Sequence, residues 1–167
     1  EKYALPTVRN ADHTFYAITE PSGGSDPARA IQTSAVRDGD DWVLNGTKVF
    51  ITGAGLSDWG IVFARTGPGE GRHGVSAFIV ERETPGLTMT AIPVIRPHYP
   101  YELAFEDCRI PSANLLGEVG KGFDLTTKLL GKLRFPYSAG NLGVAVAAQR
   151  MAVEYAKQRS VFGELLS

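Results

Sequence analysis

Polar and flexible residues lie close together just after the first β-prone run of the chain. The run ends at Thr19-Glu20-Pro21, and Gly23-Gly24-Ser25-Asp26 follows after one further residue. Adjacent glycines let a backbone approach a ligand closely, and the amides beside Ser25 can form a concave site for an anion. Asp26 can cap the turn or start a short helix. Taken alone, the segment predicts either a phosphate-binding corner or an ordinary Asx-type turn.

Other patterns that could carry chemistry are weaker. Residues 69–74 match G-x-G-x-x-G, but "VSAFIV" follows, which is typical of a strand and not of the helix that a dinucleotide site requires. We therefore interpret this glycine-rich stretch as a hairpin loop. His13, His73 and His98 are far apart in sequence and show no ligand spacing, so we predict no metal site.

Composition limits the class of protein. The chain has 167 residues with 43% apolar residues, enough for one domain or one domain and part of another. A formal net charge of -1 gives no support for a nucleic-acid or anionic-membrane partner. The single cysteine, Cys108, excludes an internal disulfide. No apolar run approaches the roughly 20 residues that span a bilayer.

The ends of the sequence predict that it is a piece of a longer protein. It starts at Glu1 and stops at Ser167, directly after a helical run and a glycine. No signal peptide is visible, so we expect a protein that is not secreted.

The first part of the chain is predicted to be β-rich. Short β-prone runs recur with turn signals between them, a pattern that predicts an antiparallel β-barrel or sandwich. Asn45-Gly46 suits a type I′ hairpin turn between two of the runs, and Asp38-Gly39-Asp40 is a second turn of this kind. The predicted strands are Thr14–Thr19, Ile31–Arg37, Trp42–Leu44, Thr47–Ile51, Trp59–Arg65, Val75–Glu81, Leu87–Val94 and Tyr101–Glu106.

The pattern becomes helical after Gly122. Apolar residues then recur at helical spacing, Pro136 is expected to interrupt or kink the helix, and Gly163 stands where a helix stop is expected. Two helices cannot bury their apolar faces alone, so we predict the first helices of a truncated helical bundle. The predicted domains are residues 1–118 and residues 119–167.

Several short motifs occur in a characteristic order: "ITEPSGGSD", "DGDDWVLNGTKVFITGA", "GVSAFIVERETPGL", "LAFEDCRIPSANLLGEVGKGF" and "YAKQRSVFG". Together they resemble the acyl-CoA dehydrogenase family of flavoproteins, from about Phe15 to the end of the chain. The resemblance implies a subunit with an N-terminal helical domain, a middle β-barrel domain and a C-terminal four-helix bundle. The present chain would hold the middle domain and the start of the bundle.

The resemblance also implies a reaction. Family members bind FAD and oxidise the Cα–Cβ bond of an acyl-CoA thioester to a trans-2-enoyl-CoA, with hydride transfer to flavin N5. The expected partners are an acyl-CoA substrate, an electron-transfer flavoprotein and further copies of the chain in a dimer or tetramer. The expected location is the bacterial cytoplasm or the mitochondrial matrix.

Cofactor-binding residues follow from the resemblance. Tyr16, Ile18 and Thr19 would line the isoalloxazine, with Thr19 donating near N1 and the C2 carbonyl. Gly24 and Ser25 would lie at the pyrophosphate, and Ser25 would also touch CoA.

A second segment, "FIT", matches the W-I-T of the family. Thr52 would form a hydrogen bond with flavin N5, and Ile51 would contribute backbone contacts. Phe50 replaces the usual tryptophan; it can still stack but lacks the indole N–H donor. Arg159 and Phe162 match R-x-x-F-G, which contacts the FAD of a neighbouring subunit.

Simpler interpretations remain open for several of these residues. Arg134 matches an arginine near the CoA nucleotide and is the other substrate-binding candidate besides Ser25, but it fits a surface residue equally well. Thr52 fits an ordinary strand hydroxyl, and Arg159 fits a cation at a helix C-terminus. Glu20 is expected to organise its loop and not to act as a base.

The sequence departs from the family in two places. "IPVIRPHYPYELAFED" is shorter and richer in proline than the family segment near the substrate, where Tyr99 and Tyr101 either reshape the pocket or simply pack. Leu133 stands at the position where a minority of members carry the catalytic Glu. We therefore predict no catalytic residue within this sequence, and we expect the isolated fragment to be inactive and to bind FAD weakly.

Alternatives to the dehydrogenase remain. The same scaffold could belong to a non-catalytic subunit of a hetero-oligomeric complex, an acyl-CoA oxidase or a flavin monooxygenase. A ligand-binding β-barrel that carries the turn motif by coincidence is a further alternative.

Overall fold

The computed structural model describes residues 2–68, 71–95 and 98–166. The chain forms two compact units, Glu1–Leu125 and Thr126–Ser167. The predicted boundary at residue 118 lies between the last strand of the first unit and the long helix that begins at Gly122.

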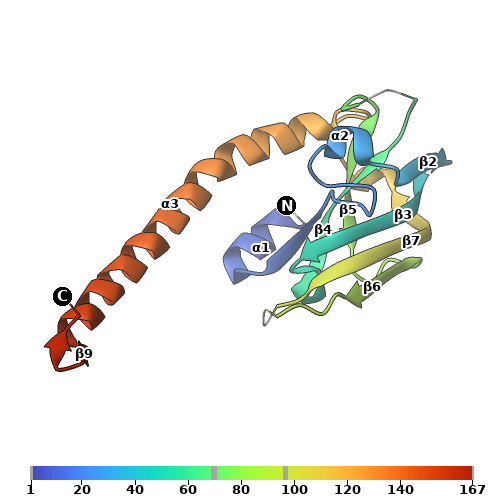
Figure 1. The fold of residues 1–167 in the computed structure, drawn as a ribbon. Coiled ribbons are helices and arrows are strands. Elements are labelled where there is room, and N and C mark those ends of the chain that lie inside the picture. The colour runs from blue at the N-terminus through green and yellow to red at the C-terminus, as the bar shows by residue number, and fades with distance from the viewer. Residues whose placement is uncertain (1, 69–70, 96–97, 167) are drawn as a thin grey trace. The chain divides into compact units, whose positions relative to one another are not determined.

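The first unit begins with a short helix, α1 (Ala4–Asn10), and a second short helix, α2 (Pro27–Ala30), lies between β1 and β2 (Figure 1). Two 3-10 turns, Ala54–Leu56 and Ser112–Asn114, connect later elements. Its strands are β1 (His13–Ala17), β2 (Ser34–Asp38), β3 (Asp41–Thr52), β4 (Ser57–Arg65), β5 (Val75–Glu81), β6 (Leu87–Ala91), β7 (Pro100–Pro111) and β8 (Leu115–Leu116).

Within the described residues these strands form one eight-stranded sheet in the order β6-β7-β3-β2-β4-β5-β8, with β1 paired to β4 outside this order. The mainly-β prediction is confirmed, but the sheet is mixed, because β1 and β2 each pair with β4 in parallel. Parallel strands need a long crossover between them. Residues 18–56 connect β1 to β4, and residues 39–56 connect β2 to β4. The first part of the longer connection, residues 18–33, contains the polar segment with the paired glycines.

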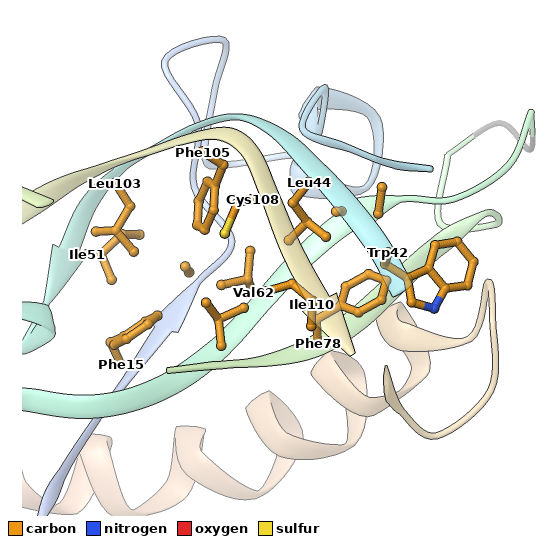
Figure 2. Close-up of a cluster of buried hydrophobic side chains, with 14 of the residues drawn as sticks. Phe15, Trp42, Leu44, Ile51, Val62, Phe78, Leu103, Phe105, Cys108 and Ile110 are labelled. Carbon is orange, nitrogen blue, oxygen red and sulfur yellow. The ribbon is translucent and has the colours of Figure 1, made fainter. Parts of the chain in front are cut away.

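The main core is formed by side chains that point inward from most strands of this sheet. Side chains from β3 and β7 meet side chains from β1, β4 and β5 in one buried cluster (Figure 2). Within this cluster the ring centroids of Trp42 and Phe78 lie 5.5 Å apart. A second, smaller cluster forms around Ile31, Phe63, Val75 and Ala77. Tyr16 and Ile18 pack against this second cluster, while Phe15 and Ala17 face the main core, as the alternation of a strand requires.

The hairpin predicted at Asn45-Gly46 is wrong. β3 runs through this dipeptide, and its register with β7 shifts between Leu44 and Gly46, which marks a bulge and not a turn. Gly46 has a φ of 144°, and a Cβ built there would lie 2.6 Å from the Cα of Thr33. The glycine thus allows close approach of a neighbouring backbone. The other predicted turn is confirmed, because Gly39 has a φ of 60° and Asp38 pairs with Asp41.

The glycine-rich stretch that matches G-x-G-x-x-G connects two antiparallel strands. Its residues 69 and 70 lie outside the described residues. β4 and β5 pair from Trp59 with Glu81 to Arg65 with Val75, so the connection is a hairpin loop, as predicted. A dinucleotide-binding helix does not follow it.

The second unit is mainly one helix. α3 (Gly122–Gln158) runs without a break through Pro136, so the expected pair of helices is one long helix (Figure 1). The helix stops before Gly163, and β9 (Ser160–Val161) and β10 (Glu164–Leu165) form a small hairpin after it. Among the described residues, none of the helices has the length and apolar character to span a membrane.

Candidate functional site

Two chain segments that sequence reasoning singles out lie side by side. The Val49 amide donates to the Thr19 carbonyl at 2.9 Å. A Cβ built on Gly53 would lie 3.8 Å from the Thr14 carbonyl oxygen. Residues 14–19 and residues 49–53 therefore run antiparallel along each other. This arrangement brings the Tyr16 to Thr19 segment next to the Phe50 to Thr52 segment.

The hydroxyl groups of Thr19 and Thr52 are available to a ligand. Thr19 is half-buried and Thr52 is exposed. Within the described residues neither hydroxyl makes a hydrogen bond. Hydroxyl groups held on ordered backbone without a protein partner are ready donors for an external acceptor.

The backbone at Phe50 is strained. Its φ is 59° in the left-handed region, and the register of β3 shifts between Lys48 and Ile51. The kink leaves the Phe50 ring 62% exposed while Ile51 is buried in the main core. The buried side chain of Ile51 is therefore not accessible to a ligand. Strain of this kind is held by the surrounding structure and is frequent at functional sites.

Tyr16 and Ile18 lie on the opposite face of their segment from the main core. Both are half-buried, and the Tyr16 ring packs 4.9 Å from that of Phe63 at an interplanar angle of 54°. This packing fixes the Tyr16 ring while leaving part of its surface accessible.

The segment after Thr19 forms a tight corner. Glu20 and Gly23 exchange backbone hydrogen bonds of 3.4 and 3.0 Å. The turn returns the chain onto Thr19, since a Cβ built on Gly24 would lie 3.0 Å from Cγ2 of Thr19. Gly24 and Ser25 are exposed, and their amides make no hydrogen bond within the described residues. Free amides at a glycine corner are the donor set that a pyrophosphate requires.

A buried ion pair, which sequence reasoning missed, lies beneath this corner. Lys48 Nζ is 2.7 Å from Glu20 Oε1, and the two side chains are 0% and 4% exposed. The Glu20 carboxylate also accepts the amides of Gln32 at 2.6 Å and Thr33 at 3.0 Å. These contacts confirm Glu20 as a residue that organises its loop. The burial of Lys48 could have been predicted from sequence. Lys48 lies an even number of residues after Trp42 and Leu44 in β3, and side chains at such spacing point to the same, buried face of a strand.

The electrostatics of the pair keep it charged at pH 7. Burial raises the pKa of Glu20, but the Lys48 ammonium and the hydrogen bonds from Thr33 and Gln32 outweigh burial, so the pKa lies below its ordinary value. Burial lowers the pKa of Lys48 to about 8, against the attraction of Glu20.

Tyr101 packs on the backbone near the end of β3 and also lines a small cavity there. A Cβ built on Gly55 would lie 2.1 Å from the Tyr101 hydroxyl, so the ring lies directly on this glycine. A cavity of about 120 Å³ adjoins the contact. It is lined by Gly53, Gly55, Leu56, His98, Tyr99 and Tyr101.

The remaining predicted residues belong to the second unit. Arg134 and Leu133 lie in α3, where Arg134 is exposed and Leu133 is half-buried. Arg159 follows the helix and is exposed. Phe162 and Gly163 form the turn of the β9–β10 hairpin with φ values of 55° and 90°, and Phe162 is fully exposed. An exposed aromatic ring held in strained backbone suits contact with a partner outside this unit.

Metal chemistry finds no support in the residues that the structure describes, since these contain no cluster of three or more His, Cys, Asp or Glu able to hold an ion. Cys108 is buried, and burial raises its pKa to about 11, so it is a poor thiolate nucleophile.

Comparison with known proteins identifies the family. Residues 16–108 match the family model for the middle domain of acyl-CoA dehydrogenase. The chain is 44% identical over 163 residues to an acyl-CoA dehydrogenase of Bacillus subtilis (strain 168), covering 95% of this chain and 43% of that protein.

Solved structures agree. Butyryl-CoA dehydrogenase from Megasphaera elsdenii matches with a TM-score of 0.91 and 40% identity, over 99% of this chain and 44% of that one. A glutaryl-CoA dehydrogenase from Mycobacterium smegmatis, in complex with FADH2, matches with a TM-score of 0.88 and 33% identity, over 99% and 42%. The present chain thus spans less than half the length of these relatives. By the match over its middle segment and by its identity with these proteins, this chain belongs to the acyl-CoA dehydrogenase family.

Proposed function

We propose that this chain supplies the FAD-binding middle domain and the first helical segment of a flavin-dependent acyl-CoA dehydrogenase. The reaction is oxidation of the Cα–Cβ bond of an acyl-CoA thioester to a trans-2-enoyl-CoA. FAD, when bound, accepts the hydride at its N5 atom. The observation that carries the proposal is the side-by-side placement of the Thr19 and Thr52 segments with both hydroxyl groups unpartnered within the described residues.

The donors of the first unit fit the cofactor. Thr19 would donate to the N1 and C2 carbonyl side of the isoalloxazine and Thr52 to the N5 side. The free amides of Gly24 and Ser25 would hold the pyrophosphate. Fixed donors at the positions where negative charge gathers stabilise the transition state without reorganisation. The exposed Phe50 ring would stack against the cofactor from the kinked end of β3.

Residues of the second unit would complete the site. Arg159 and Phe162 would contact the FAD of a neighbouring copy, which makes the proposed enzyme a dimer or tetramer. Ser25 and Arg134 would contact CoA. Leu133 cannot accept a proton, so the base that removes the α-proton is proposed to lie outside this sequence or to be absent.

The proposed electron acceptor is an electron-transfer flavoprotein, and the proposed location is the bacterial cytoplasm or mitochondrial matrix. The isolated 167-residue chain is expected to be inactive, because it carries no proposed catalytic base and only part of the proposed FAD site.

The test uses the protein in its full natural length. We expect a yellow protein with the visible absorbance of oxidised flavin. Anaerobic titration with butyryl-CoA and longer acyl-CoA thioesters should bleach this absorbance with one of them. A protein without flavin would contradict the proposal, and flavin that no acyl-CoA reduces would favour the non-catalytic subunit. Fast reoxidation of the reduced flavin by oxygen would favour an oxidase or monooxygenase.

A further inference from the structure

The buried pair of Lys48 and Glu20 connects all three segments of the first unit that are proposed to hold FAD. Lys48 lies in β3, two residues before Phe50. Its ammonium reaches Glu20 at 2.7 Å and the Ile18 carbonyl at 3.4 Å. β3 is therefore tied to the chain on both sides of Thr19.

The Glu20 carboxylate extends this connection to the glycine corner. It accepts the amides of Gln32 and Thr33, which follow α2. One carboxylate thus closes the base of the loop of residues 21–31, and this loop carries Gly24 and Ser25. A shift of Lys48 would move the Thr19 segment, the glycine loop and the end of β3 relative to one another.

We propose that Lys48 and Glu20 are positioning residues that set the spacing between the threonine donors and the pyrophosphate loop of the FAD site. This inference rests on the proposed function, since it assumes that FAD is bound there. Neither side chain is accessible enough to touch the cofactor, as they are 0% and 4% exposed.

Energetics favour a geometric role over a purely stabilising one. A buried ion pair must overcome the desolvation of both charges, and replacing both partners by uncharged side chains is often neutral for folding. Removing one partner alone leaves an unpaired buried charge and is strongly destabilising. FAD binding and hydride transfer, in contrast, respond to displacements of a fraction of an ångström in the residues that hold the cofactor. Removing both charges should therefore affect FAD binding more than folding.

The test compares two double variants of the protein in its full natural length. Lys48→Met with Glu20→Gln removes the buried pair while keeping the side-chain lengths similar. Arg109→Met with Asp38→Asn is the matched control, because it removes an exposed ion pair between β7 and β2 of the same sheet. Lys48→Met alone is expected to fold poorly, and the double variant avoids this problem.

Three quantities are measured on each protein: the unfolding temperature without FAD, the dissociation constant for FAD, and the reduction potential of the bound flavin. For the buried-pair variant we expect the unfolding temperature to change by less than about 4 °C. We expect its dissociation constant for FAD to rise about tenfold or more. The flavin potential should shift as well, because the threonine donors move. The control should leave all three quantities close to those of the wild type.

The outcomes separate this inference from the proposed function. If the wild-type protein binds no FAD, the proposed function itself fails. If the wild type binds FAD and the buried-pair variant binds it equally tightly with an unchanged potential, the positioning role is overturned. It is also overturned if the double variant does not fold without FAD, since the pair would then serve the fold.

Discussion

Thr19 and Thr52 are the side chains that we expect to act most directly on the cofactor. Replacing either by valine removes one donor and conserves the shape. Since neither hydroxyl has a partner within the described residues, the free energy of unfolding should change by less than about 0.5 kcal/mol. Flavin reduction by the acyl-CoA that reduces the wild type should slow by about tenfold, equivalent to about 1.4 kcal/mol, which stopped-flow absorbance measures.

The control for these variants is Thr90→Val. Thr90 is an exposed threonine in β6 opposite Glu102 and is no part of the predicted site. It should leave both stability and flavin reduction unchanged. Equal rates of flavin reduction in all three variants would show that Thr19 and Thr52 do not act on the flavin.

Glu20 gives the first unit a predictable dependence on acid. Its pKa is lowered in the folded state, so its contribution to stability is present above pH 4.5 and is lost as pH falls through the folded value. Glu20→Gln should destabilise the protein at pH 7 by about 3 to 5 kcal/mol, because Lys48 is left buried and unpaired. The variant should then lose less further stability between pH 5 and pH 3 than the wild type does. Thermal unfolding across this range measures the difference.

Glu81→Gln is the comparison for the acid effect. The pKa of Glu81 is also lowered, by hydrogen bonds from Lys2 and Tyr3, but its ion pair with Lys2 is exposed. Solvent screens such pairs, so this variant should follow the acid profile of the wild type closely. A Glu20→Gln profile parallel to that of the wild type would show that Glu20 titrates normally.

Single residues also show where sequence reasoning fails. The polar residues near Thr19 could be selected from their types and order, because turn chemistry is local. Lys48 was missed, because dividing β3 at Asn45-Gly46 broke the alternation that assigns Lys48 to the buried face. Its partner Glu20 is 28 residues away, and no local pattern connects the two.

At the scale of elements, Gly46 is the point where β3 passes close to Thr33, opposite a bulge in β7. Gly46→Ala places a Cβ in positive-φ backbone and against the Cα of Thr33. Backbone strain of this kind costs about 1 to 3 kcal/mol, and we expect the upper part of this range because backbone cannot move aside. Urea unfolding measures the loss.

Gly39→Ala is the matched glycine variant. Gly39 also has positive φ, but nothing lies within 4 Å of a Cβ built there. Only the intrinsic penalty of the left-handed conformation applies, about 1 to 2 kcal/mol. If both variants lose the same stability, the close approach of Thr33 does not constrain β3.

The elements show what pattern reasoning can and cannot supply. β5 was predicted with its observed bounds, because apolar residues bounded by turn signals determine such a strand locally. The parallel pairing of β1 and β2 with β4 could not be predicted, since it depends on a crossover between distant residues. Positive φ at Phe50 and Phe162 was equally invisible, because nothing in either residue type signals a left-handed conformation.

At the scale of the whole molecule, α3 presents apolar side chains that the second unit does not cover. Among them, Leu142, Val144 and Met151 are 66%, 70% and 74% exposed. Large exposed apolar surfaces are rare and mark sites that contact a partner. The order of the motifs indicated the family from the sequence alone. It could not show which apolar side chains of this helix remain exposed to solvent.

The last prediction concerns the neighbouring copy that we propose to share the FAD site. Arg159 and Phe162 are exposed at the end of the second unit, and Phe162 is held in strained backbone. Arg159→Ala in the full-length protein should weaken FAD binding by about tenfold or more, since a charged hydrogen bond contributes about 1.5 to 3 kcal/mol. Arg150→Ala, which removes an exposed arginine from α3, should not weaken it.

Because the arginine would act on the cofactor of another copy, a mixing experiment tests the geometry. Subunits that carry Arg159→Ala are mixed with subunits that carry Thr19→Val and Thr52→Val. A mixed dimer then has one site with both changes and one site with neither. We expect the mixture to regain tight FAD binding in about half of the sites of mixed dimers. No recovery, with mixed dimers demonstrated by mass spectrometry, would place Arg159 at the site of its own chain.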